Sequence, residues 1–136
     1  MFFEKVSLVT GGFDPIHSGH IRYFERAKDL SNYLVVGLNG DPWLTRKKGQ
    51  YFQSWTERAD IIRHLNMVDA VVSWDDVDDS ACGAIEKCLE ISQTVVFCNG
   101  VCFTVRLTRL FSKCFRPYSP PLLHIPNNFL CRSKYP

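Results

Sequence analysis

The chain has 136 residues, of which 46% are hydrophobic and 22% are charged, and its formal net charge is +2. This length suits one compact domain, and the composition excludes a collagen-like, mucin-like or wholly disordered chain. No window approaches the roughly 18 consecutive apolar residues of a membrane-spanning helix, and the first residues do not resemble a signal peptide. We therefore expect a cytoplasmic protein that has no membrane partner.

The charge is distributed unevenly along the chain. Residues 1–100 contain 10 Lys and Arg and all 14 Asp and Glu, whereas residues 101–136 contain 6 Lys and Arg and no acidic residue. Five of the seven prolines also lie after residue 100. We predict an α/β domain over residues 1–100 and an atypical, basic, proline-rich tail over residues 101–136.

The cysteines predict neither a disulfide framework nor a zinc site. No pair has the C-x-x-C spacing that is typical of zinc ligands, and disulfides are rare in the cytoplasm. We therefore expect free thiols, with Cys82, Cys88 and Cys98 in or near the core. The six cysteines are Cys82, Cys88, Cys98, Cys102, Cys114 and Cys131.

The predicted elements alternate between strands and helices. Short β-branched or apolar runs predict strands at 6–10, 33–38, 70–74 and 94–98. Apolar residues at helical spacing predict helices at 18–30, 54–65 and 81–90, whereas 39–54 are interpreted as a polar connection. This order predicts an α/β, Rossmann-like open parallel sheet with helices on both faces. Ligands of such sheets bind beyond the carboxyl ends of the strands.

The candidate site is therefore the segment Gly11–His20, which joins the first strand to the first helix. Its two leading glycines permit a sharp turn and a close approach of the backbone to a ligand. The free N–H groups at the start of the following helix favour an anion such as phosphate. His17 and His20 are three positions apart, so they can share one face of the first turn. Two imidazoles placed there suit charge stabilisation at a phosphorus atom.

This segment resembles the H-x-G-H signature of the cytidylyltransferase-like nucleotidyltransferase superfamily, which includes glycerol-3-phosphate cytidylyltransferase and the heptose adenylyltransferase domain. The resemblance covers about residues 5–100, because the Gly-Phe-Asp before the signature, the helix after it, the lysines before residue 50 and the Thr-Glu-Arg at 56–58 also match. It implies transfer of CMP or AMP from CTP or ATP to a phosphorylated small-molecule acceptor. Pyrophosphate is released, usually with Mg²⁺ present.

The resemblance also implies roles for individual residues. The two histidines match those that bind the triphosphate and stabilise the transition state, the residues just before them match backbone that contacts the nucleotide, and the lysines fall where the family has a phosphate-binding lysine. Arg58 matches an arginine common at the start of its helix and takes a supporting role. The catalytic candidates are His17, His20 and Lys48, and the nucleotide-binding candidates are Gly12, Phe13, His17, His20 and Lys47. No resident metal site is predicted, and a homodimer is consistent with the family.

The resemblance stops after Gly100. The family's fourth strand leads to a further helix and strand and then to an R-T-x-G-I-S-T-like motif, and nothing similar occurs before Pro136. We therefore expect a sheet that lacks the family's last strand and helix, with a replaced or out-of-frame tail. The alternative function is a catalytically impaired, truncated nucleotide-binding remnant or scaffold, so the sequence leaves enzymatic activity open.

Other interpretations of these patterns are simpler. The histidines could serve only as helix caps, and zinc would require a third ligand at suitable spacing. The acidic run at 75–79 lacks the glycine and glutamate of an EF-hand loop, and helix capping explains it better. The basic tail has no recognisable nucleic-acid-binding module, so we expect no nucleic acid partner. The predicted partners are a nucleoside triphosphate and a phosphorylated acceptor.

Overall fold

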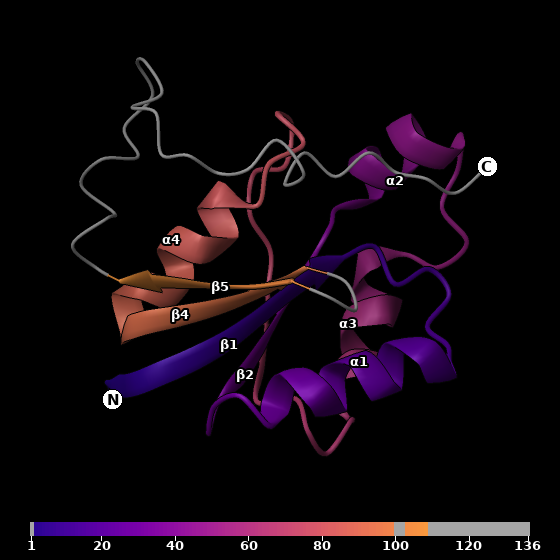
Figure 1. The fold of residues 1–136 in the computed structure, drawn as a ribbon. Helices are drawn as coiled ribbons and strands as arrows, with labels where there is room; N and C mark the ends of the chain where they lie inside the picture. Colours follow the sequence, from indigo (N-terminus) through magenta and orange to yellow (C-terminus); the bar gives the residue numbers. More distant parts are fainter. Residues whose placement is uncertain (1, 100–102, 109–136) are drawn as a thin grey trace.

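The computed structural model describes residues 2–99 and 103–108 as a five-stranded sheet with helices on both faces (Figure 1). The strand order is β3-β2-β1-β4-β5, and the pairings among the first four strands are all parallel. The elements are β1 (Phe3–Gly11), α1 (Ser18–Lys28), β2 (Leu34–Leu38), α2 (Asp41–Lys48), α3 (Trp55–Arg63), β3 (Ala70–Val72), α4 (Cys82–Ile91), β4 (Ser92–Asn99) and β5 (Phe103–Thr108). The predicted Rossmann-like α/β fold is confirmed. Within the described residues, no helix is long and apolar enough to cross a membrane.

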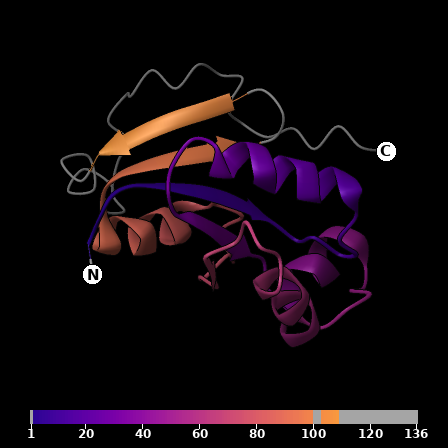
Figure 2. The same cartoon turned by 90° about the horizontal axis from the view of Figure 1, so that it is seen from below.

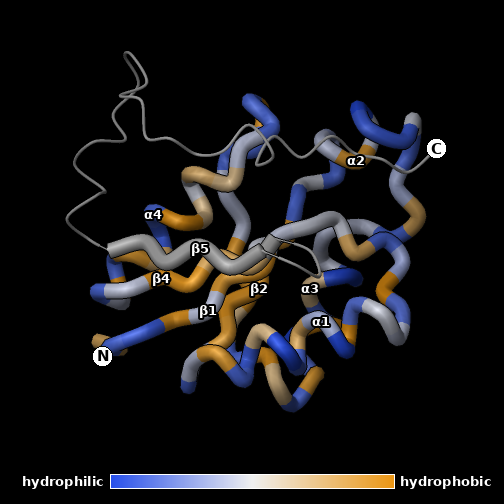
Figure 3. The backbone as a smooth tube through the Cα atoms, viewed as in Figure 1, coloured by the Kyte–Doolittle hydropathy of each residue, from blue (hydrophilic) through white to orange (hydrophobic). Residues whose placement is uncertain are grey.

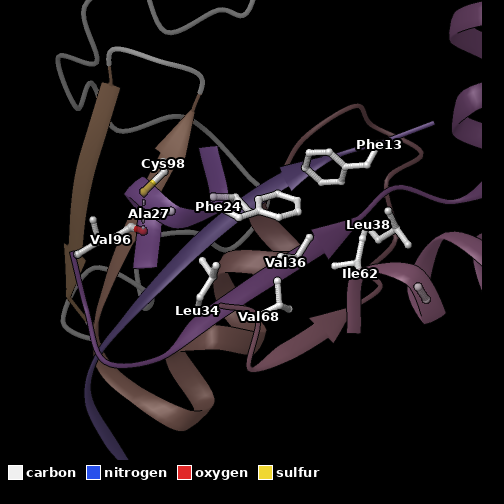
Figure 4. Packing of buried hydrophobic residues seen from close by; sticks show 12 residues of the cluster. Phe13, Phe24, Ala27, Leu34, Val36, Leu38, Ile62, Val68, Val96 and Cys98 are labelled. Atoms are coloured by element: carbon white, nitrogen blue, oxygen red, sulfur yellow. Dashed lines mark hydrogen bonds between the residues drawn. The ribbon is translucent and has the colours of Figure 1, made fainter. Parts of the chain in front are cut away.

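Two hydrophobic clusters hold the layers together, one on each face of the sheet. Helices α1 and α3 lie on one side and α4 lies on the other, as Figures 1 and 2 show. Figure 4 shows the first cluster, in which Phe24 of α1 and Ile62 of α3 pack against Val36. The second cluster joins Cys88 of α4 to Val35 and to the neighbouring strands. Successive residues of a strand point to opposite faces, so adjacent apolar residues of β2 serve both clusters.

The apolar run of β2 therefore marks a strand that is covered on both sides. All five of its residues are buried, and the hydropathy colouring of Figure 3 shows an apolar stretch at the centre of the sheet. The crossover helices of a parallel sheet lie on both of its faces, so its central strands are buried on both sides.

One helix was missed by the sequence interpretation. The segment 39–54 was expected to be a polar connection, but it contains α2. Only Leu44 of this helix is buried, so no apolar periodicity marks it. Pro42 in the first turn and Gly49 just after the last turn, with a φ of 86°, are the local signals that were available.

The sheet contains a fifth strand, within the segment that was predicted to be a basic tail. The edge of β4 is not left open, because β5 pairs with it in antiparallel register from Thr94 with Thr108 to Asn99 with Phe103. Only three residues separate the two strands. Such a connection can form a hairpin, whereas a parallel pair needs a crossover of a dozen or more residues. The remainder of the predicted tail, 100–102 and 109–136, lies outside the described residues.

The cysteines of the domain are free thiols, as predicted. Cys88 and Cys98 are buried and Cys82 is half-buried. Burial raises the pKa of the Cys88 thiol to about 12 and that of Cys98 to about 11, so both stay protonated and unreactive near neutral pH. Cys102, Cys114 and Cys131 lie outside the described residues.

Candidate functional site

The candidate residues gather where β1 and β2 end. The β1–α1 connection, the start of α1, helix α2 and the α2–α3 connection all lie at this edge of the sheet (Figure 1). Parallel strands place their carboxyl ends on one edge, so segments far apart in sequence meet there.

The two signature histidines form a pair at the start of α1. His17 is the N-cap residue, and its Nδ1 accepts a hydrogen bond from the Gly19 backbone N–H at 3.1 Å. The His17 backbone N–H donates in turn to Nδ1 of His20 at 3.3 Å. The rings stack with 3.7 Å between their centroids. Capping and pairing therefore coexist, and the simpler interpretation as helix caps describes only part of the arrangement.

These hydrogen bonds fix where the ring protons lie. Each Nδ1 accepts from a backbone N–H, so the proton of each neutral ring is on Nε2. Because the rings are stacked with only 23° between their planes, they present two Nε2–H donors at the amino end of a helix. The dipole of that helix end also favours an anion. The arrangement can therefore bind a phosphate group.

Burial keeps His20 neutral. Desolvation, and after it the nearby His17 and Lys48, together lower its pKa from 6.5 to about 4. At neutral pH, His20 is thus a hydrogen-bond donor without charge. The positive charge beside it comes from Lys48.

The two lysines of α2 point to different partners. Lys48 Nζ donates to the backbone carbonyl oxygen of Asp14 at 3.3 Å, within the segment that carries the histidines. Lys47 Nζ lies 3.1 Å from a carboxylate oxygen of Asp79 and 5.7 Å from the centre of the Trp43 ring. The structure therefore brings Lys48 to the histidine pair and places the ammonium group of Lys47 on the β3–α4 connection.

Gly12 and Phe13 form the turn before the histidines. A Cβ on Gly12 would lie 2.7 Å from a methyl group of Leu44, so glycine allows α2 to pack directly on the backbone here. Phe13 has a φ of 47°, and its buried ring meets the His20 ring edge-on at 5.0 Å between centroids. The same ring contacts Phe24 of the core. The Phe13 ring therefore positions the His20 ring relative to the core, while the Phe13 backbone forms part of the turn.

Arg58 is more important to the site than the sequence indicated. Its guanidinium is fully buried and donates to three backbone carbonyls, those of Gly12 at 2.8 Å, Asn39 at 2.9 Å and Gln53 at 3.0 Å. It also pairs with the Asp41 carboxylate. One side chain therefore holds together the ends of β1 and β2, the start of α2 and the α2–α3 connection.

Asp14 is a site residue that the sequence interpretation missed. Its carboxylate accepts from the backbone N–H groups of Phe52 at 2.6 Å and Gln53 at 2.8 Å. It therefore holds the α2–α3 connection against the β1–α1 connection. Its place between Phe13 and the histidines in the signature was the available signal.

The described residues do not form a protein cage for a metal ion. No group of three or more His, Cys, Asp and Glu side chains among them could hold one. The carboxylate of Asp14, in the β1–α1 connection, already accepts two backbone hydrogen bonds. Mg²⁺ commonly keeps several waters and binds mainly through substrate phosphates, so these residues fit an ion that enters with its nucleotide better than a resident one.

The neutral state of His20 predicts a pH dependence of stability. Its pKa of about 4 in the folded chain lies below the value of 6.5, so the unfolded chain binds the proton first as the pH falls. The stability contributed by neutral His20 is complete above pH 6.5 and is lost as the pH falls towards 4.

We therefore expect the thermal midpoint to drop by a few degrees more between pH 7 and pH 5 in the wild type than in His20→Gln. The effect is small because the ring is only half-buried, and solvent screens its charge. Scanning calorimetry at both pH values measures it, with the exposed His64→Gln as the control. An equal drop in wild type and His20→Gln would contradict the assignment.

Comparison with known proteins agrees with this geometry. The sequence profile described as cytidylyltransferase-like matches residues 8–100. The bifunctional protein HldE of Campylobacter concisus is 41% identical over 75 residues, which are 54% of this chain and 16% of that protein. The FAD synthase of Thermococcus sibiricus is 42% identical over 71 residues, which are 51% of this chain and 48% of that protein. The chain thus spans about a sixth of the HldE protein and about half of the FAD synthase.

A solved structure shares the fold. The lipopolysaccharide core biosynthesis protein from Thermoplasma volcanium superposes with a TM-score of 0.53 and 26% sequence identity, covering 68% of this chain and 72% of that one. The profile match includes the histidine pair, Lys48 and Arg58, which the structure places at one edge of the sheet. The chain belongs to the cytidylyltransferase-like family of nucleotidyltransferases.

Proposed function

We propose that this protein transfers CMP or AMP from CTP or ATP to a phosphorylated small molecule. The observation that carries this proposal is the pair of Nε2–H donors on His17 and His20 at the start of α1, with Lys48 beside them. These groups suit the phosphates of a nucleoside triphosphate. The substrates implied by the reaction also fit the cytoplasmic location expected from the sequence.

The proposed reaction is an in-line displacement at phosphorus. A phosphate oxygen of the acceptor attacks the α-phosphorus, a new P–O–P bridge forms, and the bond to the bridging oxygen between the α- and β-phosphates breaks. Pyrophosphate leaves with the electron pair of that bond. Positioning and charge neutralisation supply most of the rate in such transfers.

The residues of the chain would divide this work between them. The uncharged His20 and its partner His17 would donate hydrogen bonds to oxygens on which charge develops, and preorganised donors of this kind are the main source of such stabilisation. Lys48 would supply the positive charge for the phosphates. Gly12 and Phe13 would offer backbone to the nucleotide. Mg²⁺ would neutralise phosphate charge as part of the nucleotide substrate.

The names of the two relatives do not give one acceptor in common. One is named FAD synthase and the other is the bifunctional protein HldE, and they match 71 and 75 residues of the chain at 42% and 41% identity. Both support nucleotidyl transfer at the level of the superfamily, so we propose the transferred group and name no acceptor beyond a phosphorylated small molecule.

The lysines of α2 provide a sharp test of the proposal. Titration calorimetry with ATP and with CTP, each with Mg²⁺, should show binding of one nucleotide. Lys48→Met should weaken that binding by about tenfold, which corresponds to losing one charge-assisted hydrogen bond. Lys47→Met should weaken nucleotide binding by a factor several-fold smaller than that of Lys48→Met, because the Lys47 ammonium group pairs with the Asp79 carboxylate.

A phosphate-release assay with added pyrophosphatase then tests transfer to a panel of phosphate monoesters. Nucleotide binding without pyrophosphate release from any acceptor would favour the impaired remnant. Failure of both nucleotides to bind the folded chain would contradict the proposal.

A further inference from the structure

Two adjacent aromatic side chains stand exposed beside the phosphate-binding residues. On the connection between α2 and α3, the side chain of Phe52 is 78% exposed and that of Tyr51 is 46% exposed. The other exposed large hydrophobic residues of the described chain, Phe2, Leu30 and Val77, are isolated from one another in sequence. Single exposed apolar residues are ordinary, but two neighbouring aromatic rings at the edge of a candidate site need an explanation.

The backbone that carries these rings is held against the site by one residue. The Asp14 carboxylate accepts from the N–H groups of Phe52 and Gln53, and the Asp14 carbonyl oxygen accepts from Lys48 Nζ. Asp14 therefore touches both the aromatic segment and the lysine proposed to bind phosphate. The rings occupy a fixed segment next to the phosphate site.

The cost of this arrangement points to a ligand. A phenylalanine that stays in water gains none of the free energy that burial of its ring would supply. A flat ring stacked on its face would cover it, and such stacking accepts many kinds of ring because each has a π-face. The surface of two side chains is far too small for a stable protein–protein interface. It matches the size of one ring system.

We propose that Tyr51 and Phe52 form a stacking surface for a flat ring on the phosphate-bearing ligand of this site. The ring belongs either to the base of the nucleoside triphosphate or to a ring-bearing acceptor phosphate. The inference rests on the proposed function only in placing the phosphates at His17, His20 and Lys48. It adds a determinant of ligand choice that lies outside the H-x-G-H segment.

The test compares ligands that have a ring with ligands that lack one. Binding of ATP, CTP and flavin mononucleotide is measured by titration calorimetry, beside ring-free tripolyphosphate and glycerol 3-phosphate. Phe52→Ala should weaken at least one ring-bearing ligand by about 5- to 30-fold, which is the usual range for loss of one stacking partner. The same variant should bind tripolyphosphate within about twofold of wild type, and Phe52→Trp should restore ring binding.

The controls separate stacking from other effects. Val77→Ala removes another apolar side chain, 73% exposed, from the β3–α4 connection, and it should change none of these affinities. The thermal midpoint of Phe52→Ala should equal that of the wild type, because the side chain is mostly in water. Loss of affinity for ATP or CTP assigns the ring to the base, and loss for flavin mononucleotide assigns it to the acceptor.

Three results would overturn the inference. The first is a Phe52→Ala protein that binds every ring-bearing ligand as the wild type does, and the second is an equal loss for ring-free and ring-bearing ligands. If no ring-bearing ligand binds while a ring-free phosphate does, the inference also falls. If tripolyphosphate itself does not bind, and His17→Asn changes nothing, then the proposed function fails instead.

Discussion

Replacing His17 with asparagine should lower the rate of nucleotidyl transfer by about 100- to 1,000-fold, the usual cost of losing one preorganised donor. Asparagine is a good N-cap residue, so its side-chain oxygen can still accept from the Gly19 N–H, as His17 Nδ1 does now. The variant therefore keeps the start of α1 and removes the Nε2–H donor. Steady-state kinetics of pyrophosphate release measure the effect, and a circular dichroism melt shows that the helix is intact.

The matching substitution His20→Gln should cost a similar factor, and the double variant should cost less than the product of the two. The rings stack and share a hydrogen-bond chain, and groups that act as a unit are not additive. His64→Ala serves as the control, because His64 is the C-cap residue of α3 and its Nδ1 contacts the Asp60 carbonyl one turn away. Full activity in His17→Asn would refute the role assigned to the pair.

The order of the elements could be predicted from the sequence because it depends on local periodicity. The all-apolar run of β2 and the helical spacing in α1 each report which face is buried. Helix α2 could not be found in this way. It buries only Leu44, and its place in the fold comes from contacts of its polar side chains with distant segments, such as that of Arg46 with the Asp76 carbonyl.

The candidate site could be predicted only in part, namely where its residues lie close together in the sequence. The signature histidines are neighbours in sequence, so their spacing alone indicates that they share a helix face. The choice between Lys47 and Lys48 depends on which loop each side chain meets, and Asp14 and Asp79 are more than thirty positions away from them along the chain. The neutral state of His20 depends on burial, which its own sequence neighbourhood does not encode.

The antiparallel pair of β4 and β5 lies where the sequence resemblance ends. Because residues after 100 no longer match the family, we expected the sheet to lack the family's last strand and helix. The edge strand forms nevertheless, since three intervening residues allow antiparallel pairing of whatever extended segment follows. Backbone pairing requires little of the side chains, so the end of a resemblance is a poor guide to the end of a sheet.

Arg58→Ala should lower the free energy of unfolding by about 3–5 kcal/mol, the largest stability change that we expect in this chain. The substitution would remove every donor that Arg58 supplies to the carbonyls of Gly12, Asn39 and Gln53. Each buried acceptor left without a partner costs about 1–3 kcal/mol. Urea denaturation followed by tryptophan fluorescence measures the difference.

Arg58→Lys tests whether charge or geometry matters, and it stays informative if the alanine variant fails to fold. A lysine has no planar fork and cannot reach several carbonyls in different directions, so this variant should still be destabilised by about 2 kcal/mol or more. Arg63→Ala, on the same helix with a half-exposed side chain and a surface pair to Asp60, should cost at most about 1 kcal/mol. Equal effects of the Arg58 and Arg63 substitutions would show that the loops at the carboxyl edge hold together without the buried guanidinium. Because those loops carry Gly12 and the connection to Phe52, a loosened edge should also reduce nucleotide affinity in Arg58→Lys at temperatures where the protein is still folded.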